Sequence, residues 1–338
     1  MMTHSQPVRV GIIGAGVMGQ YFAPHFKDIP AAELVAVADI DEGRAQALAT
    51  QYHIPSYYQD YEHMLEEEDI DAVLVLTPDK YHRDPCVAAA DQGKHVFVEK
   101  PLVTVLEEGK EIVERAKANN VVLTVGHSLR FDPRIASIQE AVRRGDLGEL
   151  IHIHTRRNAY LHTGQKYAQN TSLAFFLSVH DADMVNWITG SRVVKVYSRG
   201  GAKLLGAYGQ YDSTFSVLQF EDGTIACLEN SWALPETATS IRPHAIEVVG
   251  TEGMCFLQMG EQGMGVYTKS STVFPDVITR SELYGTIVGV YREEMAHFID
   301  CIVNGTEPAV SGEDGLAAAR VAIAIQESLD SGREVTLL

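Results

Sequence analysis

The feature that most constrains the fold of this chain is an apolar run near its start that breaks into three glycines. Residues 8–13 read VRVGII, and Gly14, Gly16 and Gly19 punctuate the stretch that follows. This order predicts a strand, a tight turn and the start of a helix. In such a unit the first glycine permits the turn, the second lets backbone approach a pyrophosphate, and the third lets helix pack on strand. The N–H groups of the helix N-terminus can then hold phosphates.

An acidic residue after the second apolar run supports a dinucleotide site. Residues 33–38 lead into Asp39, which follows Gly14 by about twenty-five residues, the separation expected for a ribose-binding carboxylate. A carboxylate there accepts from the ribose 2′-hydroxyl and repels a 2′-phosphate, and no arginine follows it directly, so the pattern favours NAD over NADP. The alternative is a solvated turn residue, because Asp41 and Glu42 also suit the first turn of the next helix.

Composition narrows the class of protein. The 338 residues suffice for two domains, and the net charge of −18 argues against a nucleic-acid or anionic-membrane surface. The start lacks a signal-peptide pattern and no apolar run is long enough to span a bilayer, so we expect a cytoplasmic protein. The cysteines are far apart and lack a C-x-x-C pair, which predicts reduced thiols rather than disulfides or a zinc site. They are Cys86, Cys227, Cys255 and Cys301.

The first part of the chain alternates continuous apolar runs with amphipathic segments, which predicts a doubly wound parallel sheet covered on both faces. Strands are expected at residues 8–13, 34–38, 72–76, 95–98 and 121–125, and helices at 41–52, 81–92 and 106–119. Ligands bind at the carboxyl ends of such strands. Gly14, Asp39, Thr77 and Lys100 all follow strand ends, so we expect them to face one crevice.

The pattern then changes to apolar–polar alternation, which predicts an open, mostly antiparallel sheet with helices on one face and a partner subunit on the other. A hairpin is expected at residues 221–223. Further strands are expected near 151–156, 214–220, 224–230, 245–249 and 254–257, with helices at 134–144, 291–303 and 312–331. The fold class is therefore α/β, with a dinucleotide-binding domain at 1–127 and a substrate-binding and oligomerisation α/β domain at 128–338.

Lys100 is a candidate for proton transfer. It lies in the sequence Glu99-Lys100-Pro101, and Pro101 favours an extended backbone at Lys100. A lysine near a nicotinamide could hydrogen-bond a substrate hydroxyl and exchange its proton while hydride moves. The alternative is a solvated turn lysine.

His180 is a second candidate, because it opens a helical pattern that Gly190 ends. At or just before a helix N-terminus, imidazolium is disfavoured, so we expect a neutral His180 that can act as acceptor or base. A capping or core histidine is the alternative. Asp181 and Asp183 suit the role of acids in the first helical turn.

Other polar residues are less specific. His127, His152, His154 and His162 could lie near one another, but no histidine pair has a supporting carboxylate at helical spacing, so we predict no metal site. The polar or aromatic residues suited to sugar binding are Arg130, Asn158, Tyr160 and Tyr291.

The motifs GIIGAGVMG, AVADID, VLTPDKYH, VFVEKPL, VGHSLRFDP and HDADMVNWITG occur in this order, and over nearly its whole length the chain resembles the Gfo/Idh/MocA family. The resemblance implies an N-terminal Rossmann domain and a C-terminal α/β domain whose open sheet commonly mediates dimers or tetramers. It also implies oxidation or reduction of a sugar or cyclitol hydroxyl or carbonyl with a nicotinamide cofactor.

The resemblance also implies roles for individual residues, with Lys100 and His180 as the catalytic pair. The implied cofactor-binding residues are Gly14, Ala15, Gly16, Val17, Met18, Gly19, Asp39, Ile40, Thr77, Pro78, His82, Glu99 and Lys100. The implied substrate-binding residues are Lys100, Arg130, Asn158, Tyr160, Phe176 and His180. The family usually has an aspartate four residues before the histidine. Here Phe176 stands there, so this site is drier and lacks one acceptor.

These observations favour an NAD-dependent sugar or cyclitol dehydrogenase that acts as a homodimer or homotetramer. One alternative is an enzyme that cleaves glycosides by transient oxidation and recycles its NAD. Another is a non-catalytic NAD-binding regulatory protein. Net release of NADH distinguishes the first hypothesis from the other two.

Overall fold

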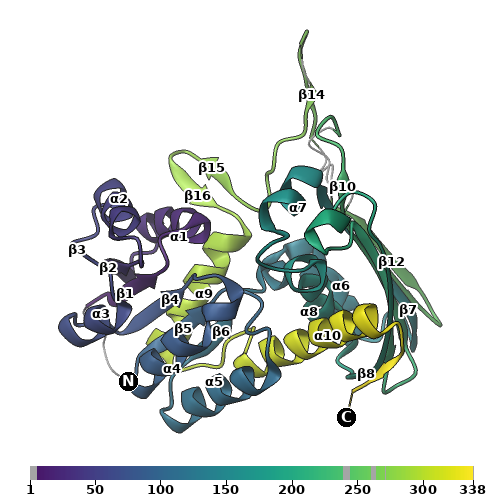
Figure 1. The fold of residues 1–338 in the computed structure, drawn as a ribbon, viewed down its shortest axis with the longest axis horizontal. Coiled ribbons are helices and arrows are strands. Elements are labelled where there is room, and N and C mark those ends of the chain that lie inside the picture. Colours follow the sequence, from purple (N-terminus) through teal and green to yellow (C-terminus); the bar gives the residue numbers. More distant parts are fainter. Residues whose placement is uncertain (1–5, 239–243, 260–263, 271, 338) are drawn as a thin grey trace. The chain divides into compact units, whose positions relative to one another are not determined.

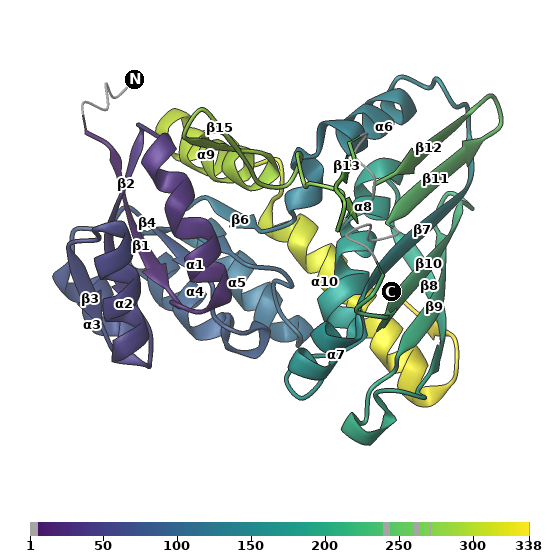
Figure 2. The same cartoon turned by 90° about the horizontal axis from the view of Figure 1, so that it is seen from above.

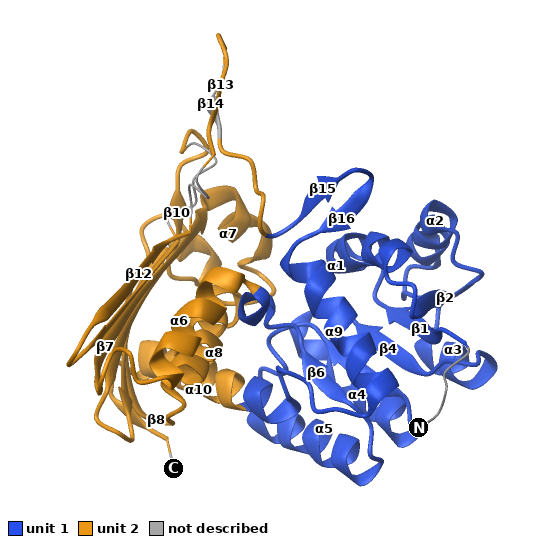
Figure 3. Ribbon diagram, turned by 180° about the vertical axis from the view of Figure 1, so that it is seen from behind, with its two compact units in different colours: residues 1–131, 279–316 blue, residues 132–278, 317–338 orange. Residues whose placement is uncertain are grey.

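The computed structural model describes residues 6–238, 244–259, 264–270 and 272–337. The chain forms two compact units, coloured separately in Figure 3. The first comprises residues 1–131 and 279–316, and the second comprises 132–278 and 317–338. Each unit therefore contains two separate segments, because a stretch from near the C-terminus packs with the N-terminal part.

The first unit is built on a six-stranded parallel sheet with the order β3-β2-β1-β4-β5-β6 (Figure 1). The strands are β1 (Val8–Ile13), β2 (Ala32–Ala38), β3 (Ser56–Tyr58), β4 (Ala72–Val75), β5 (His95–Val98) and β6 (Leu123–Val125). This is the doubly wound order, in which the direction of winding reverses between β1 and β4. The predicted parallel sheet is confirmed, and the short edge strand β3 is an addition to it.

Helices surround this sheet. They are α1 (Val17–Phe22), α2 (Glu42–Tyr52), α3 (Tyr61–Glu67), α4 (Arg83–Asp91), α5 (Leu106–Ala118) and α9 (Val290–Asn304), with 3₁₀ turns η1 (Ala23–Asp28), η2 (Asp79–Tyr81) and η3 (Ser128–Phe131). The late helix α9 joins this unit because Met295, Phe298 and Ile299 are buried in the same core as β1 and α1. A small hairpin of β15 (Ser281–Leu283) and β16 (Thr286–Val288) precedes α9.

The second unit is built on a seven-stranded sheet with the order β12-β11-β7-β10-β9-β8-β17. Its strands are β7 (Leu150–Tyr160), β8 (Val193–Gly201), β9 (Ser213–Phe220), β10 (Ile225–Leu234), β11 (Ala245–Gly250), β12 (Met254–Gln258) and β17 (Val335–Thr336). Strand β7 pairs with β10 in parallel, and the other described pairings are antiparallel. The predicted hairpin between β9 and β10 is confirmed.

Helices cover one face of this second sheet, as Figure 2 shows from above. They are α6 (Pro133–Arg143), α8 (Val179–Thr189) and the part of α10 (Gly312–Ser331) from residue 317 onward. Helix α7 (Leu161–Tyr167), the π-helical turn η4 (Ala174–Ser178), the 3₁₀ turn η5 (Gly206–Tyr208) and the strands β13 (Val266–Tyr267) and β14 (Thr272–Val273) complete the unit. Of the helices that the structure describes, none is long and apolar enough to cross a membrane.

Candidate functional site

The three glycines after β1 differ in the space around them. Gly14 has φ +108°, and a Cβ there would lie 2.8 Å from the carbonyl carbon and oxygen of Leu76 at the end of β4. A Cβ on Gly19 would collide with the carbonyl oxygen of Gly14, whereas a Cβ on Gly16 would meet no heavy atom within 4 Å. The first and third glycines are thus required by packing. The space beside Gly16 suits the close approach of a pyrophosphate, so these residues fit the predicted dinucleotide.

Asp39, at the end of β2, binds the glycine turn itself. Its Oδ2 accepts from the Ala15 N–H at 2.8 Å, and its Oδ1 accepts from the Asp41 N–H at 2.9 Å. The half-buried Asp39 therefore fastens the glycine turn to the end of β2 and to the turn before α2. Its predicted bond to a ribose hydroxyl stays a prediction, as does the contact assigned to the exposed Ile40. Sequence reasoning missed the bond to Ala15 because spacing reveals no particular backbone partner.

His82 connects the ends of two strands. The ring is buried, with Nε2 2.9 Å from the carbonyl oxygen of Thr77 and Nδ1 2.9 Å from that of Pro101. Burial lowers the pKa of His82, although these carbonyl contacts oppose the shift. Both ring nitrogens thus meet backbone oxygens in the first unit. The predicted cofactor contacts of Thr77, Pro78 and His82 stay predictions.

Glu99 is a buried carboxyl at the end of β5. Burial raises its pKa to about 7, against the opposing charge of the neighbouring Lys100. The hydroxyl of Tyr291, on α9, bonds to Ser128, and burial together with the charge of Glu99 raises the pKa of that tyrosine. Because the pKa of Glu99 is itself raised to about 7, part of its carboxyl is protonated near neutral pH. The sequence pattern gave no sign of this, since burial of a strand-end side chain depends on distant α9.

Tyr291 and Arg130 both contribute to the structure of the first unit. The Tyr291 ring lies 4.8 Å from that of Tyr21, edge to face. Arg130 is buried, with Nη2 3.1 Å from Asp314 and Nη1 donating to the Ala309 carbonyl at 3.0 Å. Arg130 therefore fastens η3 to the first turn of α10 and to the segment before it. Its predicted substrate contact stays a prediction.

The expectation for His180 is wrong in one respect. The chain is helical from residue 173, continues through η4 and runs on as α8, so His180 lies inside a continuous helical segment rather than at its N-terminus. Ser178, before α8, already has helical dihedrals of φ −64° and ψ −28°. The dipole argument for a neutral imidazole is thereby lost. The predicted stop is confirmed, because Gly190 adopts φ +61°, and π-turns such as η4 often occur at functional sites.

Asp181 lies in the first turn of α8, as expected, and is also the centre of a buried network. Its Oδ1 accepts from Arg157 Nε at 3.0 Å and its Oδ2 from Asn230 Nδ2 at 2.7 Å, while Ser178 Oγ donates to Asn230 Oδ1 at 2.6 Å. Burial raises the pKa of Asp181, and the charge of Arg157 opposes the shift. The network fastens the start of α8 to β7 and β10. Asp183 is buried as well. Sequence reasoning missed these contacts because they join residues far apart in the chain.

The polar residues expected to bind substrate have neighbours of their own in the second unit. Asn158 Nδ2 donates to Glu229 Oε1 at 3.0 Å, and the backbone carbonyl oxygen of Asn158 lies 3.2 Å from His244 Nε2. The half-buried Tyr160 stacks on His162 at 5.6 Å. Their substrate contacts stay predictions.

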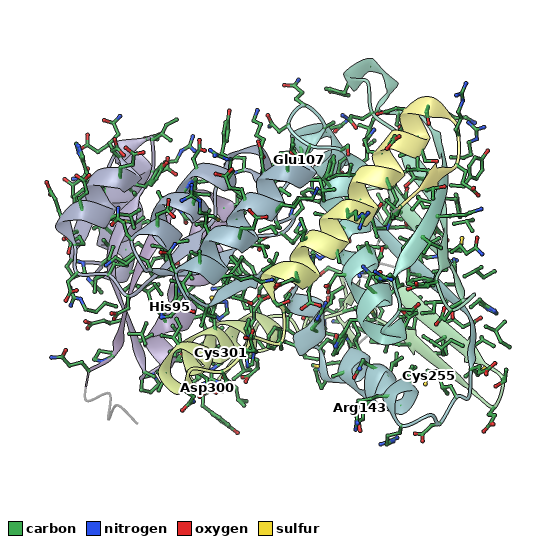
Figure 4. The ribbon with its side chains drawn as sticks, turned by 90° about the horizontal axis from the view of Figure 1, so that it is seen from below. His95, Glu107, Arg143, Cys255, Asp300 and Cys301 are labelled. Carbon is green, nitrogen blue, oxygen red and sulfur yellow. The ribbon has the colours of Figure 1, made fainter. Side chains whose placement is uncertain are left out.

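Histidines and cysteines do not gather into a metal centre in the part of the chain that the structure describes. His152 lies 3.8 Å from Glu247, and His154 lies 3.9 Å from Glu229. All four cysteines are free thiols. Figure 4 labels Cys255, on β12, and Cys301, on α9.

Comparison with known proteins agrees with this geometry. The family model of the oxidoreductase family with an NAD-binding Rossmann fold matches residues 8–127, and that of its C-terminal alpha/beta domain matches residues 139–337. The scyllo-inositol 2-dehydrogenase (NAD(+)) of Bacillus subtilis is 31% identical over 98% of this chain and 96% of its own length. The myo-inositol 2-dehydrogenase of Thermotoga maritima is 30% identical over 98% of each.

Solved structures give the same result. The crystal structure of a putative myo-inositol dehydrogenase from Sinorhizobium meliloti has a TM-score of 0.83 at 28% identity, over 98% of this chain and 100% of that one. A probable dehydrogenase from Thermotoga maritima has a TM-score of 0.84 at 27% identity, over 97% and 98%. Because both family models match in order and together cover most of its length, the chain belongs to the Gfo/Idh/MocA oxidoreductases, whose N-terminal domain is an NAD-binding Rossmann fold.

Proposed function

We propose that this protein is an NAD-dependent dehydrogenase that oxidises a secondary hydroxyl of a cyclitol or sugar. The observation that carries the proposal is the built glycine turn, with the space beside Gly16 and Asp39 at the end of β2. Full-length relatives at 30–31% identity are named as inositol 2-dehydrogenases, which favours a cyclitol. Those names do not favour the glycoside-cleaving or regulatory alternatives.

The residues of the first unit divide the task of holding NAD. The backbone from Gly14 to Gly19 would bind the pyrophosphate, and Asp39 would accept from the ribose hydroxyl and disfavour NADP. When bound, NAD accepts the hydride from the alcohol carbon. We assign this task to residues 1–127, and substrate binding to residues 128–338.

Removal of the hydroxyl proton falls to Lys100 or His180 in this proposal. Lys100 directly follows the buried Glu99, and the charge of Lys100 opposes the rise in the pKa of that carboxyl. His180 has no helix N-terminus beside it, so its protonation depends on the surrounding side chains. The pH profiles of kcat for Lys100→Met and His180→Asn would show which variant loses the fall in activity at acidic pH that protonation of the base causes.

NADH formation is the decisive measurement. Purified protein with NAD or NADP is tested on a panel of inositols, free sugars, nucleotide sugars and glycosides. Absorbance that rises with NAD and one class of polyol supports the proposal and identifies the substrate class. NAD binding by calorimetry with no NADH from any of the panel compounds contradicts it and favours the two alternatives.

Lys100→Ala should lower kcat by about a hundredfold or more, as expected for loss of a positioned acid–base group. Lys110→Ala is the matched control, because Lys110 is an exposed lysine on α5 of the same unit. Near wild-type turnover in Lys100→Ala would exclude Lys100 from the mechanism.

We also propose that the protein is a cytoplasmic homodimer or homotetramer assembled through the open sheet. The face of that sheet without helices exposes apolar side chains on four strands. Exposed apolar patches of this kind often mark protein–protein interfaces. They are Tyr197, Phe215, Val217, Ile225, Met254 and Phe256. Four free thiols agree with a reducing compartment. A monomeric mass by light scattering would contradict the assembly.

A further inference from the structure

In the second unit, Phe176, four residues before His180, belongs to a group of three aromatic rings. The Phe176 ring stacks on that of Tyr167 at 5.1 Å with 28° between the ring planes, and it lies 5.5 Å from the Trp232 ring at 58°. Phe176 is half-buried, whereas its neighbours Leu173 and Leu177 are buried. We call Tyr167, Phe176 and Trp232 the aromatic platform.

Three elements hold the platform in place. Tyr167 ends α7, Phe176 lies in η4, and Trp232 lies on β10. Trp232 is fully buried in one cluster with Leu173, Leu177 and Leu205, and Phe176 packs against that cluster. A Cβ on Gly164 would lie 2.9 Å from Trp232 Cβ, so α7 packs closely on the tryptophan. The position of the Phe176 ring is therefore fixed before any ligand binds.

Phe176 and His180 lie on the same side of one helical segment. They are four residues apart, and the segment is continuous from η4 into α8. A group held at His180 for proton transfer would thus have the Phe176 ring beside it. A phenyl ring offers no lone pair to a hydroxyl but makes good contact with C–H bonds and other apolar surface. A substrate hydroxyl placed against it would lose a hydrogen bond that water had supplied.

We propose that Phe176 selects a ring polyol whose carbon facing the aromatic platform bears no free hydroxyl. That carbon is deoxygenated or carries an O-alkyl group, and its apolar side stacks on Phe176. The inference rests on the proposed function and names the substrate class for it. The reaction itself is unchanged: the C–H and O–H bonds of a neighbouring secondary alcohol break and a C=O bond forms. The hydride reduces NAD to NADH, and the proton leaves through Lys100 or His180.

The test compares matched pairs of substrates. Each inositol of a panel is paired with its mono-O-methyl ethers and its monodeoxy analogues, and kcat and KM are measured for each. We expect the wild type to prefer one modified compound over its parent by about tenfold or more in kcat/KM, chiefly through KM. Phe176→Asp should reverse the preference, because its carboxylate accepts from the free hydroxyl. Phe176→Leu should keep the preference but bind both compounds more weakly.

Phe175→Leu is the matched control, since Phe175 is the adjacent half-buried ring but packs on Val179, Ala318 and Ala322 instead. It should leave the preference unchanged. Circular dichroism and NAD affinity verify that each variant is folded. A wild type that prefers the parent compounds, or a Phe176→Asp variant with the wild-type preference, overturns the proposal.

Direct binding separates this proposal from the proposed function. Calorimetry on the NAD-saturated protein measures the affinity for each member of a pair without turnover. Tighter binding of a modified compound in the wild type, reversed in Phe176→Asp, supports the aromatic platform even if no NADH forms. That binding result, together with no NADH formation, would contradict only the proposed dehydrogenase function. Binding that never favours a modified compound overturns the platform, whatever the activity.

Discussion

The two units build their candidate sites from different kinds of contact. In the first, side chains bind backbone: Asp39 accepts from the Ala15 N–H, and His82 lies against two carbonyl oxygens. In the second, side chains bind side chains, through the chain of contacts from Arg157 to Asp181 and Asn230. A backbone-built site is readable from a short motif, whereas a side-chain network depends on partners far along the sequence.

The two buried carboxyls give the same contrast in electrostatic form. Burial raises the pKa of Asp181 as well, but a guanidinium at 3.0 Å and an amide at 2.7 Å oppose that rise through direct hydrogen bonds. At Glu99 burial outweighs the charge of Lys100, and the pKa rises to about 7. We therefore expect the stability of the first unit to depend on pH and on side chains added at its glycines. The stability of the second unit should depend on keeping both partners of its buried ion pair.

The largest effect is expected from Asp181→Ala. The substitution leaves the Arg157 guanidinium buried without its counter-charge, and breaking a buried pair in this way costs about 3–5 kcal/mol. Urea denaturation would measure the change in the free energy of unfolding. Glu221→Ala is the control in the same unit, because its pair with Arg192 has side chains 57% and 83% exposed and should be worth less than about 1 kcal/mol. Equal losses in the two variants would refute the contrast.

Glu99→Gln should change how stability depends on pH. The pKa is about 7 in the folded protein against an ordinary 4.5, so the unfolded chain releases this proton first. The stabilising effect of the neutral form is complete below pH 4.5 and is lost as pH rises towards 7. The full effect is about 3 kcal/mol. Glutamine is neutral throughout, so the variant should gain stability relative to wild type between pH 5 and pH 8, as measured by denaturation at each pH. A constant difference over this range would show that Glu99 does not titrate there.

Gly14→Ala and Gly16→Ala should separate fold from binding in the first unit. Alanine at position 14 meets both a φ of +108° and the Leu76 backbone at 2.8 Å, so the loss should exceed about 1 kcal/mol. Alanine at position 16 meets no atom within 4 Å and should change stability by less than about 0.5 kcal/mol. Its methyl group would nevertheless weaken NAD binding, which calorimetry would detect. Unchanged NAD affinity in Gly16→Ala would place the pyrophosphate elsewhere.

Local patterns were enough to predict most of the elements. The strands β1 and β5 and the helix α10 begin and end where expected, because continuous apolar runs and regular helical spacing mark them. The edge strand β3 was missed, since its three residues carry too little pattern to stand out, and the seven-residue helix α3 was missed as well. Strand β8 was missed too, although its burial alternates over much of its length. In the candidate site, the sequence identified the glycine turn and Asp39 but misplaced His180 relative to its helix.

By itself, the sequence determined the glycine turn and the hairpin between β9 and β10, because each depends on residues that are neighbours in the chain. The alternation of apolar strands and amphipathic helices also indicated the parallel sheet. Only the tertiary structure decided that α9 packs into the first unit, that Glu99 is buried, and that Asp181 pairs with Arg157. Burial and ion pairing depend on which distant segments meet. The residues next to a position in sequence do not indicate which distant segments will pack against it, so burial and ion pairing become visible only in the folded structure.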